Sequence, residues 1–216
     1  MKINEIFESI DGEGLRTGEL VTFIRLAGCN LRCSYCDTPY ALKGSDGTEM
    51  SIEKIIEHVK AFKSKKITLT GGEPLIHENV DSLIAELKDY EVNIETNGSV
   101  DIGPYISSPN VIVTMDYKTK SSGENKKMLL SNLEKLRETD VLKIVMSEED
   151  KADVFELLNE HEIKSYIYLS PIFEKCDPAD LVSFLKFLQL SGINVDKIRV
   201  QVQLHKIIWD PNKRGV

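Results

Sequence analysis

The sequence contains no long apolar run, no leader-like start and no excess of positive charge. No segment approaches the ~18 consecutive apolar residues that a membrane-spanning helix needs, so we expect no membrane anchor. The first ten residues, MKINEIFESI, lack a charged segment followed by an apolar one, so we expect no secretory signal and a cytoplasmic location. With 27 Lys and Arg against 35 Asp and Glu, the net charge of −8 argues against a nucleic-acid partner.

A length of 216 residues with 41% hydrophobic residues is enough for one globular core, and no linker or repeat divides the chain. We therefore predict a single domain over residues 1–216. Only four cysteines are present. In a cytoplasmic protein, cysteines are more often metal ligands or catalytic groups than disulfides.

Segments with strand and helix patterns alternate along the chain. In the helix predicted over 51–63, apolar residues recur at helical spacing after Ser51, which is placed to cap the helix. Such alternation is typical of a parallel sheet. The predicted strands are 20–27, 66–70, 91–96, 111–116, 141–146, 165–170 and 197–203, and the predicted helices are 51–63, 79–89, 126–138, 150–161 and 178–191.

One crossover differs from the others. The segment GSVDIGPYISSPN, between strands 91–96 and 111–116, is too rich in Gly, Pro and Ser for a full helix. The number of strand–helix units also falls short of the eight of a closed barrel. The pattern therefore predicts an α/β fold that is an open or partial (β/α) barrel.

The distinctive polar clusters follow the ends of predicted strands. Cysteines follow 20–27, GGEP follows 66–70, TNG follows 91–95, and DYK lies at the end of strand 111–116. In parallel α/β folds, the loops after the carboxyl ends of strands meet at one rim, where reactive groups gather. We therefore expect these clusters to form one site.

Cys29, Cys33 and Cys36 form a C-x3-C-x2-C run. Three thiols within eight residues cannot all pair with one another as disulfides, and a 4Fe–4S cluster held by three thiolates keeps one iron open for another ligand. The alternative is a structural zinc site whose fourth ligand is His58, His77 or Cys176. We expect Cys176, far along the chain, to be a free thiol.

The cysteine run, with Tyr35 before its third cysteine, resembles the radical S-adenosylmethionine (SAM) superfamily. Gly71-Gly72-Glu73-Pro74 resembles the element that contacts the SAM amino group in that superfamily. The resemblance implies a 4Fe–4S cluster and reductive cleavage of SAM to a 5′-deoxyadenosyl radical, which abstracts a hydrogen atom from the substrate.

A narrower resemblance extends along nearly the whole chain. The segments that carry it are ESIDGEG at 8–14, Arg25, CDT at 36–38, Thr70, ETNG at 95–98, QLHK at 203–206 and the tail 209–216. They resemble the 7-carboxy-7-deazaguanine synthase family of queuosine and 7-deazapurine biosynthesis. The resemblance implies a lyase that converts 6-carboxy-5,6,7,8-tetrahydropterin into 7-carboxy-7-deazaguanine with loss of ammonia.

The same resemblance implies further properties of the protein. SAM is used catalytically, Mg2+ is required, and a reductant such as flavodoxin or ferredoxin supplies electrons. The barrel has about six core parallel strands with reduced helices, and the protein is a homodimer. We expect the substrate to be a small pterin, with no membrane partner.

The family's functional residues map onto matching positions of this chain. The cluster ligands are Cys29, Cys33 and Cys36, and Thr38 is the Mg2+ ligand. The expected SAM contacts are Tyr35, Cys36, Asp37, Gly71, Gly72, Glu73, Glu95, Asn97, Asp116, Lys118 and Ser170. The expected substrate contacts are Ile10, Asp11, Gly12, Glu13, Arg25, Thr70, His205 and Val216.

The chain departs from the family at two of these positions. Many relatives have Gln in place of Asp11 and Gln before Pro in place of Ser170, so the side-chain contacts expected there stay open. Two other positions allow different readings. Arg25, in an apolar strand, would bind the substrate carboxylate or pair with an acid such as Glu13. His205 interrupts the last predicted strand and is either a ligand contact or a core residue.

Two other functions stay open. A small radical SAM activase, which makes a glycyl radical on a partner protein, shares the cysteine spacing but does not need Glu13, Arg25, His205 and the tail together. A non-catalytic zinc-binding module needs only the cysteines.

Overall fold

The computed structural model describes residues 1–216, which form a nine-stranded sheet in the order β3-β1-β2-β4-β5-β6-β7-β8-β9. From β2 to β9 all neighbours are parallel, whereas β1 is antiparallel to both β2 and β3. The strands are β1 Lys2–Ile10, β2 Leu20–Leu26, β3 Thr48–Glu49, β4 Lys66–Gly71, β5 Glu91–Thr96, β6 Val111–Lys118, β7 Val141–Met146, β8 Tyr166–Pro171 and β9 Ile198–Val200.

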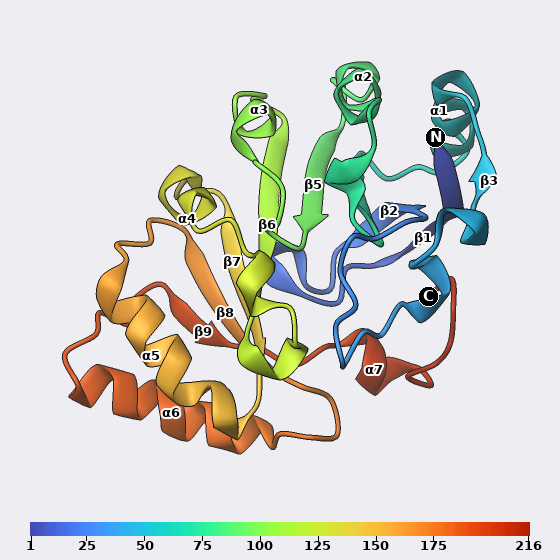
Figure 1. Ribbon diagram of the computed structural model, residues 1–216. Coiled ribbons are helices and arrows are strands. Elements are labelled where there is room, and N and C mark those ends of the chain that lie inside the picture. The colour runs from blue at the N-terminus through green and yellow to red at the C-terminus, as the bar shows by residue number, and fades with distance from the viewer.

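Helices α1 to α6 follow one another along the outer face of the curved sheet, and α7 lies apart from them beside the segment after β2 (Figure 1). No helix is long and apolar enough to cross a membrane. The helices are α1 Ile52–Lys60, α2 Val80–Glu86, α3 Gly103–Ile106, α4 Ser131–Lys135, α5 Lys151–Glu160, α6 Pro178–Leu190 and α7 His205–Ile208.

Side chains alternate between the two faces of each parallel strand, as the period of two in a strand requires. The outer residues are apolar and buried beneath the helices; Ile24, Leu69, Ile94, Met115 and Leu142 belong to one core cluster. The inner residues at neighbouring positions are largely polar. Cross-strand register pairs Arg25 with Thr70, Glu95 with Thr114, and Asp116 with Lys143. The sheet therefore separates an apolar core from a polar inner face.

The predicted partial barrel is confirmed. Strands β2 and β4 to β8 are its six long parallel strands, and β9 is a three-residue edge. The short α3 occupies the crossover that the sequence marked as irregular. Its four residues leave that crossover with a single helical turn.

Several predicted bounds were wrong. The antiparallel β1 was not predicted. The predicted helix 126–138 shrinks to α4. Residues Asn125–Lys127 form a separate 3-10 turn, and the sulfur of Met128 accepts a hydrogen bond from the backbone N–H of Lys118 on β6. Strand 197–203 ends at Val200, and His205 therefore begins α7 instead of interrupting a strand.

Candidate active site

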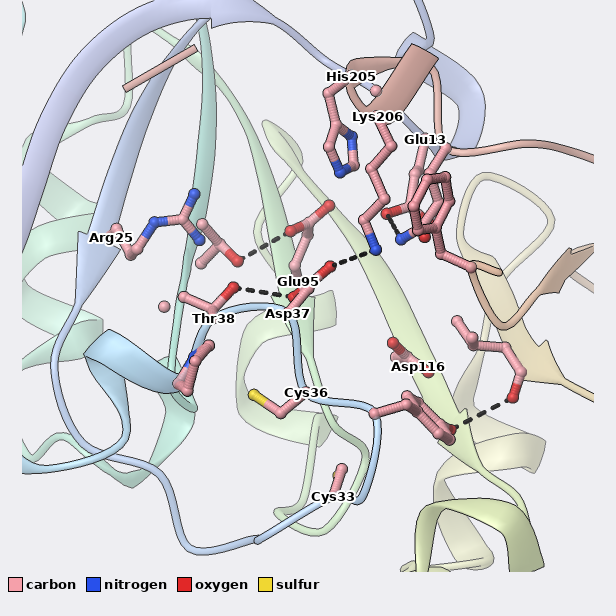
Figure 2. Close-up of a pocket in the computed structure, with 18 of the residues that line it drawn as sticks. Glu13, Arg25, Cys33, Cys36, Asp37, Thr38, Glu95, Asp116, His205 and Lys206 are labelled. Carbon is pink, nitrogen blue, oxygen red and sulfur yellow. Dashed lines mark hydrogen bonds and ion pairs between the residues drawn. The ribbon is translucent and has the colours of Figure 1, made fainter. Parts of the chain in front are cut away.

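The polar inner face of the sheet opens into a cavity of about 530 Å³. Figure 2 shows Cys33 and Cys36 at one end of this cavity and Glu13 and His205 at the other. Nearly all predicted site residues line it. They are Ile10, Asp11, Gly12, Glu13, Arg25, Cys29, Cys33, Tyr35, Cys36, Asp37, Thr38, Thr70, Gly71, Gly72, Glu95, Asn97, Asp116, Lys118, His205 and Val216.

The three cysteines are free, partly buried thiols on the loop between β2 and β3. Burial raises the pKa of Cys33 to about 11 and raises that of Cys36 as well. Metal binding to these thiols must therefore release protons. No three His, Cys, Asp or Glu side chains converge as ligands of a single metal ion, whereas an iron–sulfur cubane attaches each cysteine to a different iron. A loop of three thiols facing a cavity fits such a cluster.

Two glycines allow the GGEP turn to lie against the cysteine loop. Gly71 has φ of 140°, and a Cβ there would lie 2.1 Å from the carbonyl oxygen of Leu26. A Cβ on Gly72 would lie 2.2 Å from the carbonyl oxygen of Gly28, immediately before Cys29. A side chain at either position would thus push the two loops apart.

Glu73, predicted to accept from the ammonium of SAM, is not among the residues that line the cavity. Its fully buried carboxylate accepts hydrogen bonds from Leu75 N, Thr96 Oγ1 and Asn97 N at 3.0, 2.7 and 2.6 Å. Burial raises the pKa of Glu73 to about 7. In this structure its carboxylate holds the loop after β5, and through it Asn97, in place.

Ser170, the other predicted contact outside the cavity, is fully buried near the end of β8. Its hydroxyl has no hydrogen-bond partner in the protein. Ser170 does not line the cavity, and the side-chain contact with SAM expected here stays a prediction.

Arg25 pairs with Glu5 and not with Glu13, the acid considered from the sequence. Arg25 Nε donates to Glu5 Oε1 at 2.8 Å, and the guanidinium carbon lies 5.8 Å from the ring centre of Phe7. Glu5 lies on β1, whose existence was not predicted. The pair keeps a partly buried charge compensated while Arg25 still faces the cavity.

Glu13 belongs to a group of residues contributed by both ends of the chain. Gln203 Nε2 donates to Glu13 Oε1 at 3.0 Å, and the backbone N–H of Leu204 donates to the carbonyl oxygen of Gly12 at 3.1 Å. A Cβ on Gly12 would lie 2.2 Å from Nδ1 of His205. Gly12 is therefore the residue that lets the His205 ring stand beside the Glu13 loop.

Asp11 is buried at the base of this region. Its carboxyl accepts a hydrogen bond from Thr68 Oγ1 at 2.9 Å. Burial, and next the charge of Glu95, raise its pKa to about 7. Glu95 itself accepts a hydrogen bond from Thr70 Oγ1 at 2.8 Å.

Thr38 and the chain terminus meet the cavity from the side of α7. Thr38 Oγ1 donates to Asp37 Oδ1 at 2.9 Å, and Lys206 Nζ lies 3.4 Å from Asp37 Oδ2 (Figure 2). Val216 lines the cavity, and its neighbour Arg214 lies over the ring of Tyr40 with 3.9 Å between the guanidinium carbon and the ring centre. This stacking holds the tail against the cysteine loop.

Sequence reasoning missed Lys143. Its ammonium lies 3.2 Å from Glu13 Oε2 and 3.3 Å from Asp116 Oδ2, and Lys118 lies 3.0 Å from the same Asp116 oxygen. Burial alone would lower the pKa of Lys143, but Glu13 and Asp116 raise it well above its usual value. The signal in the sequence was a lone lysine in the apolar strand VLKIVM, since burial of an unpaired charge is costly.

Comparison with known proteins agrees with this site. Residues 23–188 match the model of the radical SAM superfamily. The chain is 41% identical over 223 residues to the 7-carboxy-7-deazaguanine synthase of Clostridium acetobutylicum, covering 100% of this chain and 99% of the relative. The enzyme of that name from Methanospirillum hungatei is 39% identical over 216 residues, covering 98% and 86%. The crystal structure of QueE from Escherichia coli has the same fold, with a TM-score of 0.70, 24% identity and 94% of each chain covered.

The cysteine loop, the glycine turn and the family match together define a radical SAM enzyme. Within that superfamily, the chain belongs to the 7-carboxy-7-deazaguanine synthase family.

Proposed function

We propose that the chain converts 6-carboxy-5,6,7,8-tetrahydropterin into 7-carboxy-7-deazaguanine with loss of ammonia, as a carbon–nitrogen lyase. The observation that carries the proposal is the cavity, in which three thiols share one chamber with an arginine, a glutamate and a histidine suited to a carboxylated pterin. The full-length relatives that bear this enzyme name support the same reaction.

The three cysteines would hold a 4Fe–4S cluster, with its fourth iron left for the amino and carboxylate groups of SAM. When bound, the cluster and SAM supply the radical that abstracts a hydrogen atom from the substrate. The chain's own residues bind and orient the two ligands and exclude water. Gly71 and Gly72 allow a ligand close to the backbone, and Asp116 offers a buried acceptor oxygen, Oδ1, that no protein group uses.

Arg25 would bind the substrate carboxylate. The Glu5 pair engages Nε, so the terminal guanidinium nitrogens remain for a bidentate contact. Glu13 would accept hydrogen bonds from the amino and ring N–H groups of the pterin. His205 and Val216 line the same cavity. A pterin ring with a carboxylate at one edge suits a cavity that has a cation, Arg25, for the carboxylate and an acceptor, Glu13, for the ring N–H groups.

Thr38 would contribute to a Mg2+ site. Mg2+ prefers oxygen ligands and keeps several waters, and Thr38 Oγ1 and the Asp37 carboxylate are oxygens on the rim of the cavity. The substrate carboxylate would complete that site. We also propose a homodimer that takes electrons from a flavodoxin or ferredoxin in the cytoplasm.

The reaction is tested by anaerobic incubation of reconstituted protein with SAM, dithionite, Mg2+ and the carboxytetrahydropterin. We expect 7-carboxy-7-deazaguanine and ammonia, with SAM recovered. Absence of product from protein that carries its cluster would contradict the proposal. Glycyl-radical formation on a partner would favour the activase, and bound zinc without iron–sulfur absorbance would favour the zinc-binding module.

A further inference from the structure

Lys143 stands at the centre of the cavity's charged groups. It lies in the middle of β7, where Leu142 and Ile144 face the apolar core and Lys143 faces the cavity. Its residue surface is 8% exposed. Burial of a lysine costs several kcal/mol unless ionic partners compensate for the lost hydration.

The partners of Lys143 come from separate parts of the chain. Glu13 lies on the loop before β2, and Asp116 lies on β6. Lys143 is the cation that the two carboxylates share, at 3.2 and 3.3 Å. Lys118, by comparison, pairs with only one carboxylate, that of Asp116. Its Nζ lies 5.9 Å from the centre of the Tyr35 ring.

Both carboxylates have buried oxygens that the protein leaves without a hydrogen bond. Asp116 Oδ1 has no partner, and Glu13 Oε2 has only the ion pair with Lys143. Buried acceptors are normally hydrogen-bonded. These two atoms are therefore available to donors of a bound ligand, and the contacts with Lys143 orient the groups that carry them.

We propose that Lys143 is a positioning residue for both ligands at once, because it holds Glu13 for the pterin and Asp116 for SAM. The inference rests on the proposed function of the cavity. One ammonium thereby sets the geometry of two binding subsites that are formed by separate parts of the chain. Both Glu13 and Asp116 lose a contact that fixes their position when Lys143 is removed.

The test compares four variants by the dissociation constants of SAM and of the carboxytetrahydropterin, measured on cluster-loaded protein without reductant. Lys143→Met should weaken both ligands by about tenfold or more, the effect of a lost charge-assisted contact. Glu13→Gln should weaken the pterin alone. Asp116→Asn and the matched lysine variant Lys118→Met should weaken SAM alone. A Lys143→Met protein that loses one affinity only, or neither, would overturn the inference.

A second variant guards against a folding defect in Lys143→Met. The double variant Glu13→Gln/Lys143→Met keeps the net charge and removes one carboxylate that the single change would leave unpaired. It should melt near the wild-type temperature yet bind SAM more weakly than Glu13→Gln does. Equal SAM binding in these two proteins would refute the role of Lys143. Failure of the wild-type protein to make 7-carboxy-7-deazaguanine would instead refute the proposed reaction, and the two failures are thus separable.

Discussion

Arg25 and Glu5 are register partners on the antiparallel strands β2 and β1, and their side chains form an ion pair at 2.8 Å. Glu5 contacts the guanidinium through Nε, and no other protein group accepts a hydrogen bond from the side chain of Arg25. The strand pairing therefore fixes the orientation of Arg25 through Nε. Its two terminal guanidinium nitrogens have no hydrogen-bond partner in the protein. The pair with Glu5 therefore leaves the two terminal nitrogens of Arg25 available for the proposed contact with the substrate carboxylate.

Replacement of Arg25 by lysine should keep the charge but lose the two-point contact with the substrate carboxylate. We expect kcat/KM for the pterin to fall by about tenfold or more, mainly through KM, since charge-assisted hydrogen bonds contribute about 1.5–3 kcal/mol. Glu5→Gln should have a smaller effect, because it disturbs only the orientation of Arg25. Steady-state kinetics at saturating SAM measure both, and an unchanged KM in Arg25→Lys would contradict the assignment.

Gly12→Ala should displace His205, because the new Cβ would lie 2.2 Å from Nδ1 of that ring. We expect weaker pterin binding with little change in SAM binding. Gly44→Ala is the matched control, since a Cβ there meets no atom within 4 Å. Titration of each ligand into the two variants makes the comparison. Equal pterin affinities in the two proteins would show that His205 has no part in substrate binding.

Replacement of Cys29, Cys33 or Cys36 by serine should abolish the visible iron–sulfur absorbance of the reconstituted protein. Cys176→Ser should retain it, because this free thiol does not line the cavity. Iron and sulfide analysis of the four variants provides the measurement. Loss of cluster in Cys176→Ser would mean that a fourth thiol participates.

The buried Asp11 should give the protein a pH-dependent stability. Its pKa is raised from 3.8 to about 7, so between these values the folded state keeps a proton that the unfolded state has lost. The free energy of unfolding therefore falls as pH rises through this range, by about 1.4 kcal/mol per unit at most. Asp11→Asn removes this contribution. The free energy of unfolding of the variant minus that of the wild type should therefore be larger at pH 8 than at pH 5. Urea unfolding curves at both pH values test this, and an equal difference at the two would contradict it.

Much of the fold could be predicted because its pattern is local. The apolar residues of the parallel strands alternate with polar ones, and the irregular crossover before β6 contains its own Gly and Pro. Strand β1 was not predicted, since the first strand expected from the sequence is 20–27. Its pairing with β2 joins residues such as Ile3 and Leu26, which are distant in sequence.

The site could be predicted where a residue belongs to a contiguous motif. The cysteine loop and Gly71-Gly72 illustrate this, and both line the cavity as expected. Ion pairs between separate strands carry no such local signature. The pairing of Lys143 with Asp116, and of Arg25 with Glu5, became evident only when the register of the sheet was known. Glu73, by contrast, lies within a motif, yet its carboxylate is committed to the hydrogen bonds of the neighbouring loop.

The contacts that join the Glu13 loop to the end of the chain also constrain how the protein folds. Gly14 N donates to Gln201 Oε1 at 2.7 Å across 187 positions of sequence, and Gln203 closes a similar span to Glu13. Contacts of such separation form slowly, because a long loop must close before they contribute stability. During synthesis the sheet from β1 to β8 can assemble before residues 201–205 have left the ribosome. We therefore expect this wall of the cavity to be among the last parts of the molecule to form.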